Sequence, residues 1–102
     1  MPIKKQTNGD TTELFFSGRV DGAAANDLEV EILNLTRTDA KTILINFAEA
    51  DFLCSAAIRV LLQHHRQLKN QQKTLLISRA SPEVNSSLQM TGFRDLLVEK
   101  IQ

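Results

Sequence analysis

A single hydroxyl at a predicted strand–helix junction offers the clearest chemistry in this sequence. Ser55 follows the apolar, strand-like segment 42–47 and begins an amphipathic, helix-like segment. The first N–H groups of a helix lack partners within the helix and carry a partial positive charge, so they favour a serine cap or an anion such as phosphate. Residue type and spacing alone therefore favour a simple cap at Ser55, with a functional hydroxyl as the alternative.

The residue before this serine, Cys54, offers a second chemistry. A thiolate is stabilised at a helix N-terminus, which can make a cysteine reactive there. Free cysteine is also one of the most commonly buried residues, and burial is the interpretation that we favour. Because the chain has one cysteine, it can form no internal disulfide and has no second thiol to resolve an oxidised form. A redox or small-molecule sensor at Cys54 is the alternative.

Two adjacent histidines complete the reactive side chains. On a helix, His64 and His65 point about 100° apart, so they do not form the usual metal-binding pair one turn apart. His65 falls on the apolar face and is expected to be packed there or at its rim. The sequence contains no nucleophile elbow, P-loop, dinucleotide fingerprint or zinc-protease motif. We therefore expect no enzyme activity, no metal site and no cofactor.

Composition restricts the partners of the chain. Its 102 residues include 12 Lys and Arg and 12 Asp and Glu, and a formal net charge of zero argues against binding nucleic acid or anionic membranes through bulk charge. Five Phe without Trp or Tyr argue against a base-stacking surface. No stretch approaches the ~20 apolar residues that span a bilayer. We expect one cytoplasmic domain over residues 1–102, with no direct nucleic-acid partner and no membrane insertion.

The N-terminal region has the pattern of a hairpin. Segment 12–17 is β-branched and aromatic, and Asn8-Gly9 before it is a turn signal, so residues 3–6 are expected to pair with it. Glycines and polar residues in 18–22 indicate a loop after the second strand.

Two later segments read as buried strands. The nearly continuous apolar runs 42–47 and 74–78 are typical of strands covered on both faces in a parallel sheet. Residues 48–52 are expected to form the turn between the first of them and the helix at Ser55.

The segments between and after the predicted strands show the spacing of apolar residues that is typical of helices. Three helices are predicted: one capped by Asn26 or Asp27 and ending near Thr36, one from Ser55 to about Gln71, and one from Ser81-Pro82 to a glycine stop at Gly92. The tail 93–98 is expected to form a short helix that leads into a last short strand.

This order of elements predicts an α/β fold. Strands that alternate with helices imply right-handed crossovers, and hence a mixed, mostly parallel sheet of about four to five strands with an N-terminal hairpin and helices packed chiefly on one face. Sites in such sheets lie at the carboxyl ends of the strands. Ser55 and the loop that contains Asp21 are therefore expected to be neighbours, although Asp21 can also be a simple turn residue.

Three motifs in register across the chain resemble the STAS family of sulfate-transporter and anti-sigma-factor-antagonist domains. Ser17–Asp21 resembles its Gly-x-(Leu/Val)-Asp motif, and 52–62 resembles its signature around a regulatory serine, commonly Asp-Ser-Ser-Gly-Leu or Ser-Ser-Ala-Gly-Leu-Arg-Val-Leu-Leu. Ser81–Val84 and Met90–Phe93 are similar to its Ser-Pro-x-Val and Met-(Ser/Thr)-Gly-(Leu/Phe) ending.

The resemblance implies a protein-binding switch of the anti-sigma-factor-antagonist type. In such proteins a serine at the position of Ser55 is phosphorylated by the partner, an anti-sigma factor and serine kinase of the histidine-kinase-like ATPase class, and a PP2C-type phosphatase reverses the modification. The unphosphorylated antagonist binds the anti-sigma factor and frees a sigma factor. The implied partner-binding residues are Asp21, Gly22, Cys54, Ser55, Ala56, Ala57 and Arg59.

Two residues depart from the family signature. Cys54 replaces the usual Asp or Ser, and cysteine is less able to orient the neighbouring hydroxyl or present it to a kinase. Ala57 replaces the usual Gly, whose missing side chain lets a partner approach closely. A poor kinase substrate, a divergent kinase and a constitutive binder are the consequences that we consider. The alternative function is an accessory or scaffold subunit, for example of a lipid-transport ABC complex or a signalling assembly.

Overall fold

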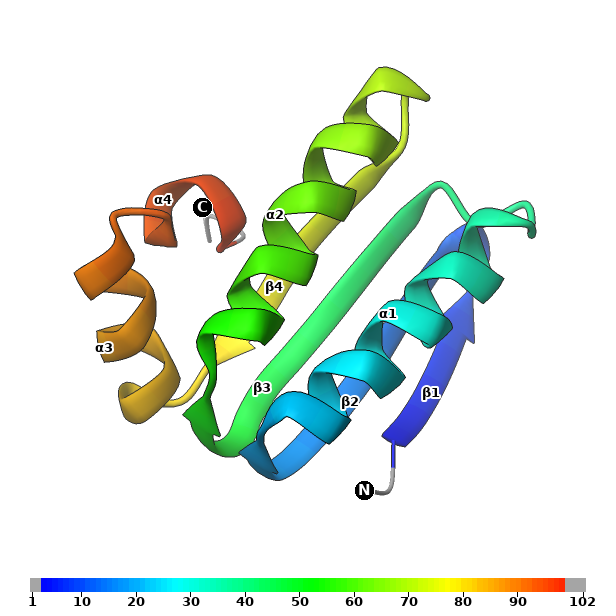
Figure 1. The fold of residues 1–102 in the computed structure, drawn as a ribbon. Helices are drawn as coiled ribbons and strands as arrows, with labels where there is room; N and C mark the ends of the chain where they lie inside the picture. The colour runs from blue at the N-terminus through cyan, green and yellow to red at the C-terminus, as the bar shows by residue number, and fades with distance from the viewer. Residues whose placement is uncertain (1–2, 99–102) are drawn as a thin grey trace.

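A four-stranded sheet in the order β1-β2-β3-β4 organises the molecule (Figure 1). The computed structural model describes residues 3–98. β1 pairs antiparallel with β2, whereas β2, β3 and β4 run parallel. The predicted α/β class, the N-terminal hairpin and the mixed, mostly parallel sheet are therefore confirmed.

The elements follow one another along the chain much as the hydrophobic periodicity predicts. The strands are β1 (Ile3–Asn8), β2 (Thr11–Val20), β3 (Thr42–Leu53) and β4 (Thr74–Ala80). The helices are α1 (Gly22–Thr36), α2 (Ser55–Asn70), α3 (Pro82–Thr91) and α4 (Arg94–Leu97).

The core lies between the sheet and the two long helices. In Figure 1, α1 and α2 both cross in front of the sheet, so the face toward them is covered. Alternate residues of β2 and β3, such as Phe16 and Phe47, point into this core, and their rings lie 5.6 Å apart between centroids. Burial of each such side chain contributes roughly 1.5–3 kcal/mol to stability. Alternating strands and amphipathic helices therefore meet in one apolar layer.

Within residues 3–98, no helix layer covers the opposite face of the sheet. Phe15, Leu44 and Leu76 are only half-buried there, so the prediction that the apolar strands are covered on both faces was wrong. A polar cluster lies among them: the Asn46 side-chain amide and the Ser78 hydroxyl both donate to Glu13 Oε2, at 3.0 and 2.6 Å. These hydrogen bonds link three strands on the open face.

All four strands are longer than predicted, and the extensions of β2 and β3 bear on the site. β3 continues to Leu53 where a turn was predicted at 48–52, and β2 continues to Val20 through most of the predicted loop. The two strands stay paired through bulge-like irregularities, with Val20 opposite Leu53. Charged residues that suggested a turn instead point to solvent from the end of β3, while Ala50 is buried.

The start of α1 also differs from the prediction. The helix begins at Gly22, one turn before the predicted caps Asn26 and Asp27. The residues of its first turn have small side chains, and both Ala24 and Ala25 are buried. Because alanine favours helix and lets the helix lie close to the sheet, this turn needs no larger apolar residue.

The C-terminal elements follow their sequence signals. Ser81 caps α3 by accepting a hydrogen bond from the Val84 N–H at 3.1 Å, Pro82 is at the first helical position, and Gly92 ends the helix with φ of 79°. The short helix predicted in the tail is α4, after which Val98 makes one parallel bridge to Ile77 beside β4. The rest of the predicted last strand lies outside the described residues.

The two faces of the sheet give a test of where the core lies. Replacement of the fully buried Phe47 by alanine should cost about 3–5 kcal/mol of unfolding free energy. Phe15→Ala, on the open face, should cost clearly less, about 1–2 kcal/mol, because the side chain is half-exposed. Urea unfolding of both variants measures the difference, and equal losses would mean that the open face is covered in solution.

Candidate functional site

The first turns of α1 and α2 lie side by side at the carboxyl edge of the sheet. Val20 and Leu53 are paired as the last residues of β2 and β3, and the Cys54 N–H donates to the Val20 carbonyl oxygen at 3.0 Å. The next residue of each chain segment is the N-cap of a helix: Asp21 for α1 and Cys54 for α2. The predicted proximity of Asp21 to the serine region therefore follows from the strand register.

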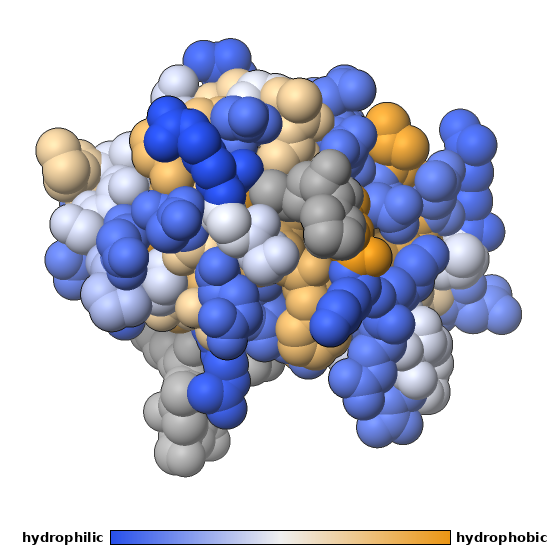
Figure 2. Space-filling model, turned by 90° about the horizontal axis from the view of Figure 1, so that it is seen from below, coloured by the Kyte–Doolittle hydropathy of each residue, from blue (hydrophilic) through white to orange (hydrophobic). Residues whose placement is uncertain are grey.

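Figure 2 looks at the molecule from this end. Hydrophilic residues dominate the view, with smaller apolar areas exposed among them. A surface of this mixed kind is typical of non-obligate protein interfaces, which as a whole are no more apolar than the rest of the surface.

Ser55 is the first helical residue of α2 and is exposed. The N-cap is Cys54, whose extended backbone continues β3 and whose carbonyl accepts from the Ile58 N–H at 3.2 Å. The prediction that Ser55 is the N-cap is therefore wrong, because the N-cap is the preceding residue, Cys54. Among the described residues the Ser55 hydroxyl makes no hydrogen bond, and the residue is exposed to solvent.

Asp21 has a structural role that the turn interpretation missed. Its Oδ1 accepts a hydrogen bond from the Ala24 N–H at 3.0 Å, which makes it the side-chain cap of α1. The carboxylate is favoured there because the helix N-terminus carries a partial positive charge. It is also exposed, so the cap holds a negative charge in a defined place beside the start of α2.

The other predicted binding residues differ in accessibility. Gly22 and Arg59 are exposed, whereas Cys54 and Ala56 are half-buried. Ala57 is 0% exposed, so its methyl group packs in the core and does not stand on the surface. Half-burial of Cys54 agrees with the packing interpretation of its thiol.

One contact beside the site could not be read from the sequence. The Arg19 guanidinium lies 3.8 Å from the centroid of the Phe52 ring, a cation–π contact between the ends of β2 and β3. These two residues are register partners, and that register was hidden because both strands were predicted to be shorter. The contact engages the Arg19 guanidinium near the carboxyl ends of β2 and β3.

The histidines lie farther along α2. His64 is the more buried of the two, and its Nε2 lies 2.9 Å from Glu29 Oε2 on α1, so the contact joins the two helices. His65 is half-buried, with Nδ1 2.8 Å from the Leu75 carbonyl oxygen, which agrees with the predicted packed or rim position. Among residues 3–98, no group of three His, Cys, Asp or Glu is arranged to hold a metal ion.

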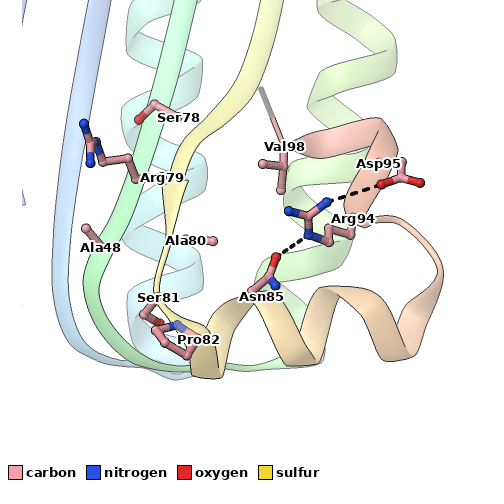
Figure 3. Close-up of a pocket in the computed structure, with 10 residues that line it drawn as sticks. All are labelled: Ala48, Ser78, Arg79, Ala80, Ser81, Pro82, Asn85, Arg94, Asp95 and Val98. Atoms are coloured by element: carbon pink, nitrogen blue, oxygen red, sulfur yellow. Dashed lines mark hydrogen bonds and ion pairs between the residues drawn. The ribbon is translucent and has the colours of Figure 1, made fainter. Parts of the chain in front are cut away.

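A separate hollow of about 910 Å³ lies beside α3 and α4 (Figure 3). Its arginines do not converge: Arg94 donates from Nε to Asn85 Oδ1 and from a terminal nitrogen to Asp95, whereas Arg79 points away from it. None of the predicted site residues lines this hollow. The candidate site is therefore the pair of helix starts.

Comparison with known families decides the identity of the domain. The family model described as "STAS domain" matches residues 2–102. The chain belongs to the STAS family. The family predicted from the three motifs is therefore confirmed, and the segment 52–62, which resembles the family signature, covers the end of β3 and the start of α2.

One curated relative has a related sequence. It is "Putative anti-sigma factor antagonist BtrV" from Bordetella bronchiseptica, 28% identical over 76 residues. The match spans 74% of this chain and 66% of the relative, slightly less than two thirds of its length.

Solved structures share the fold of this STAS domain at low sequence identity. The anti-sigma factor antagonist SpoIIAA in its unphosphorylated form matches with a TM-score of 0.83 at 18% identity, over 99% of this chain and 90% of that one. An anti-sigma factor antagonist from Mycobacterium paratuberculosis gives 0.81 at 17% identity, over 94% and 81%. SpoIIAA in its phosphorylated form, named as a Bacillus cell fate determinant, gives 0.74 at 18% identity, over 99% and 93%. These likenesses establish the fold.

Within residues 3–98, no helix is both long enough and apolar enough to cross a bilayer.

The Asp21 cap and the first helical residue of α2, Ser55, make distinct stability predictions. Asp21→Ala should lower the unfolding free energy by about 1 kcal/mol, because the Ala24 N–H loses its acceptor. Ser55→Ala should change it by less than about 0.5 kcal/mol, because the exposed hydroxyl caps nothing. Urea unfolding at low salt measures both. A loss of 1 kcal/mol or more in Ser55→Ala with a neutral Asp21→Ala would assign the cap to the serine instead.

Proposed function

We propose that this STAS domain is a regulatory anti-sigma-factor antagonist in the bacterial cytoplasm. In its unphosphorylated state it binds an anti-sigma factor and serine kinase of the histidine-kinase-like ATPase class, and phosphorylation of Ser55 releases it. A PP2C-type phosphatase restores the binding state. The domain itself catalyses nothing in this cycle. The observation that carries the proposal is an exposed hydroxyl at the first position of α2, in the segment that resembles the family signature.

The comparisons support this proposal at the level of type. The curated relative is named as an anti-sigma factor antagonist, and SpoIIAA has been solved in both unphosphorylated and phosphorylated forms. The fold of the present chain is that of SpoIIAA over nearly its whole length.

Local electrostatics supply the mechanism. A phosphoserine adds a charge of about −1.5 to −2 at neutral pH. At the first position of α2 the helix dipole tolerates this charge, so the domain keeps its fold. A partner surface that accommodates a neutral hydroxyl beside Asp21 would meet two anions after phosphorylation. Charge repulsion at this one point then causes release, and the domain does not need to change its shape.

The proposed interface uses the exposed residues around this point. Asp21 and Gly22 contribute from α1, and Ser55 and Arg59 from α2, with Cys54 and Ala56 half-buried between them. Ala57 acts in this scheme through packing under the surface.

The direct experiment combines phosphorylation with binding. The purified domain is incubated with Mg-ATP and a histidine-kinase-like anti-sigma factor from the same organism, and intact mass is recorded for the unchanged protein and for Ser55→Ala. We expect one phosphate on the first and none on the second. An active kinase that leaves Ser55 unmodified would exclude the phosphoswitch, and stable binding by that unmodified protein would favour the constitutive binder.

A charge substitution gives the corresponding binding prediction. Ser55→Glu should weaken binding to the anti-sigma factor at least tenfold, whereas Ser55→Ala should bind as the unchanged protein does. Ser86→Glu, at an exposed serine on α3, is the matched control for added charge and should have little effect. Calorimetric titration measures all four proteins. Equal affinity of Ser55→Glu and the unchanged protein would move the regulated surface elsewhere.

The phosphorylated domain should also keep its structure. In amide spectra, phosphorylation at Ser55 should shift signals of the first turns of α1 and α2 and of the adjoining end of β3, and it should leave β4 and the first half of β3 unchanged. Shifts across the whole sheet would replace the surface-charge mechanism with a conformational one.

A further inference from the structure

We infer that Arg59 is the intramolecular counter-charge for a phosphate on Ser55. Phosphorylation then acts twice on the surface, because it adds an anion and also removes a free cation. This inference rests on the proposed function, since it concerns the phosphorylated state of the same serine.

The geometry of α2 brings the two side chains together. Ser55 and Arg59 are four residues apart on a regular helix of 16 residues, and both are exposed. Residues at this spacing are neighbours, about 5–6 Å apart between Cβ atoms. Helical side chains also lean toward the N-terminus of their helix, so the long Arg59 side chain covers the turn that contains Ser55.

The charges near this turn leave Arg59 as the available cation. On α1, Asp21 presents its carboxylate as the helix cap. On β2, Arg19 is stacked on Phe52, and on β3 the exposed Asp51 is again an anion. A phosphate on Ser55 therefore meets carboxylates toward α1 and β3, and a guanidinium along α2.

The next arginine along the same helix is too distant to take part. Arg66 is also exposed, but it lies 11 positions after Ser55, roughly 16 Å along the helix axis. That separation exceeds the Debye length of about 8–10 Å at moderate salt. Arg66 is therefore a matched control, because it is an exposed arginine on the same helix as Arg59 but is too far from Ser55 to contact a phosphate there.

The inference changes what a partner encounters. In the unphosphorylated domain, Arg59 is free to meet a carboxylate on the partner. A phosphate on Ser55 offers this guanidinium charge-assisted, bidentate hydrogen bonds, which are stronger than those to a neutral hydroxyl. The net charge of the surface then changes only by that of the phosphate, but the guanidinium is engaged within the domain and no longer free to pair with a carboxylate of the partner.

The test titrates the phosphate directly. Phosphoserine is installed at position 55 during translation, and ³¹P NMR follows its second ionisation, which has a pKa near 6 in the absence of neighbours. A nearby cation favours the dianion, so Arg59→Gln should raise this pKa by about 0.2–0.4 relative to the unchanged phosphoprotein. Arg59→Lys should restore most of the difference, and Arg66→Gln should leave the pKa unchanged.

Two outcomes of the titration would overturn the inference. Identical titrations of the unchanged phosphoprotein and Arg59→Gln would remove Arg59 from the phosphate, as would an equal effect of Arg66→Gln. In support, the Arg59 Nε–H signal should shift between the serine and phosphoserine proteins. Because the phosphate is built in, a missing kinase reaction would defeat the proposed function and leave this result standing.

Discussion

The parallel pairing of β2 with β3 up to their last residues is the constraint that brings the starts of α1 and α2 together. Val20 lies opposite Leu53, and the hydrogen bond from the Cys54 N–H to the Val20 carbonyl extends the contact by one residue. Both strands therefore end at the same level, and both following helices start there. If β3 ended at Phe47, a flexible connection would separate Ser55 from Asp21, and neither residue would define the electrostatic surroundings of the other.

The two adjacent helix starts are not equivalent. α1 has a side-chain acceptor in the carboxylate of Asp21, whereas Cys54 makes no side-chain cap to α2. The anion that a helix N-terminus favours is thus already present at α1 and missing at α2. A phosphate on Ser55 would be stabilised by its own helix and opposed by the neighbouring cap. This asymmetry lets one modification be tolerated within the domain and still be unfavourable against an acidic partner surface.

Local signals predicted most of the fold, and long-range register determined what they missed. The hairpin and α3 follow from short motifs, Asn8-Gly9 and Ser81-Pro82, whose conformations depend on immediate neighbours. The end of β3 contains charged and small residues with no strand signal of their own, and it is extended because β2 lies beside it. The cap at Cys54 and the contact between Arg19 and Phe52 depend on that same extension. The family could therefore be predicted from the sequence, but the hydrogen bonding around Ser55 could not.

Cys54 changes the charge of this edge relative to the family signature, in which an acidic residue often precedes the serine. A carboxylate at the N-cap of α2 would compete with a phosphate for the same helix dipole and would repel it at short range. The neutral thiol of a cysteine or the hydroxyl of a serine does neither. With Cys54 in that position, the charged groups next to Ser55 on the two helix starts are the Asp21 carboxylate and the Arg59 guanidinium, which offset each other. Compared with the acidic signature, a phosphate on Ser55 of this chain would therefore have one anionic neighbour fewer, and it would have a cation one turn away.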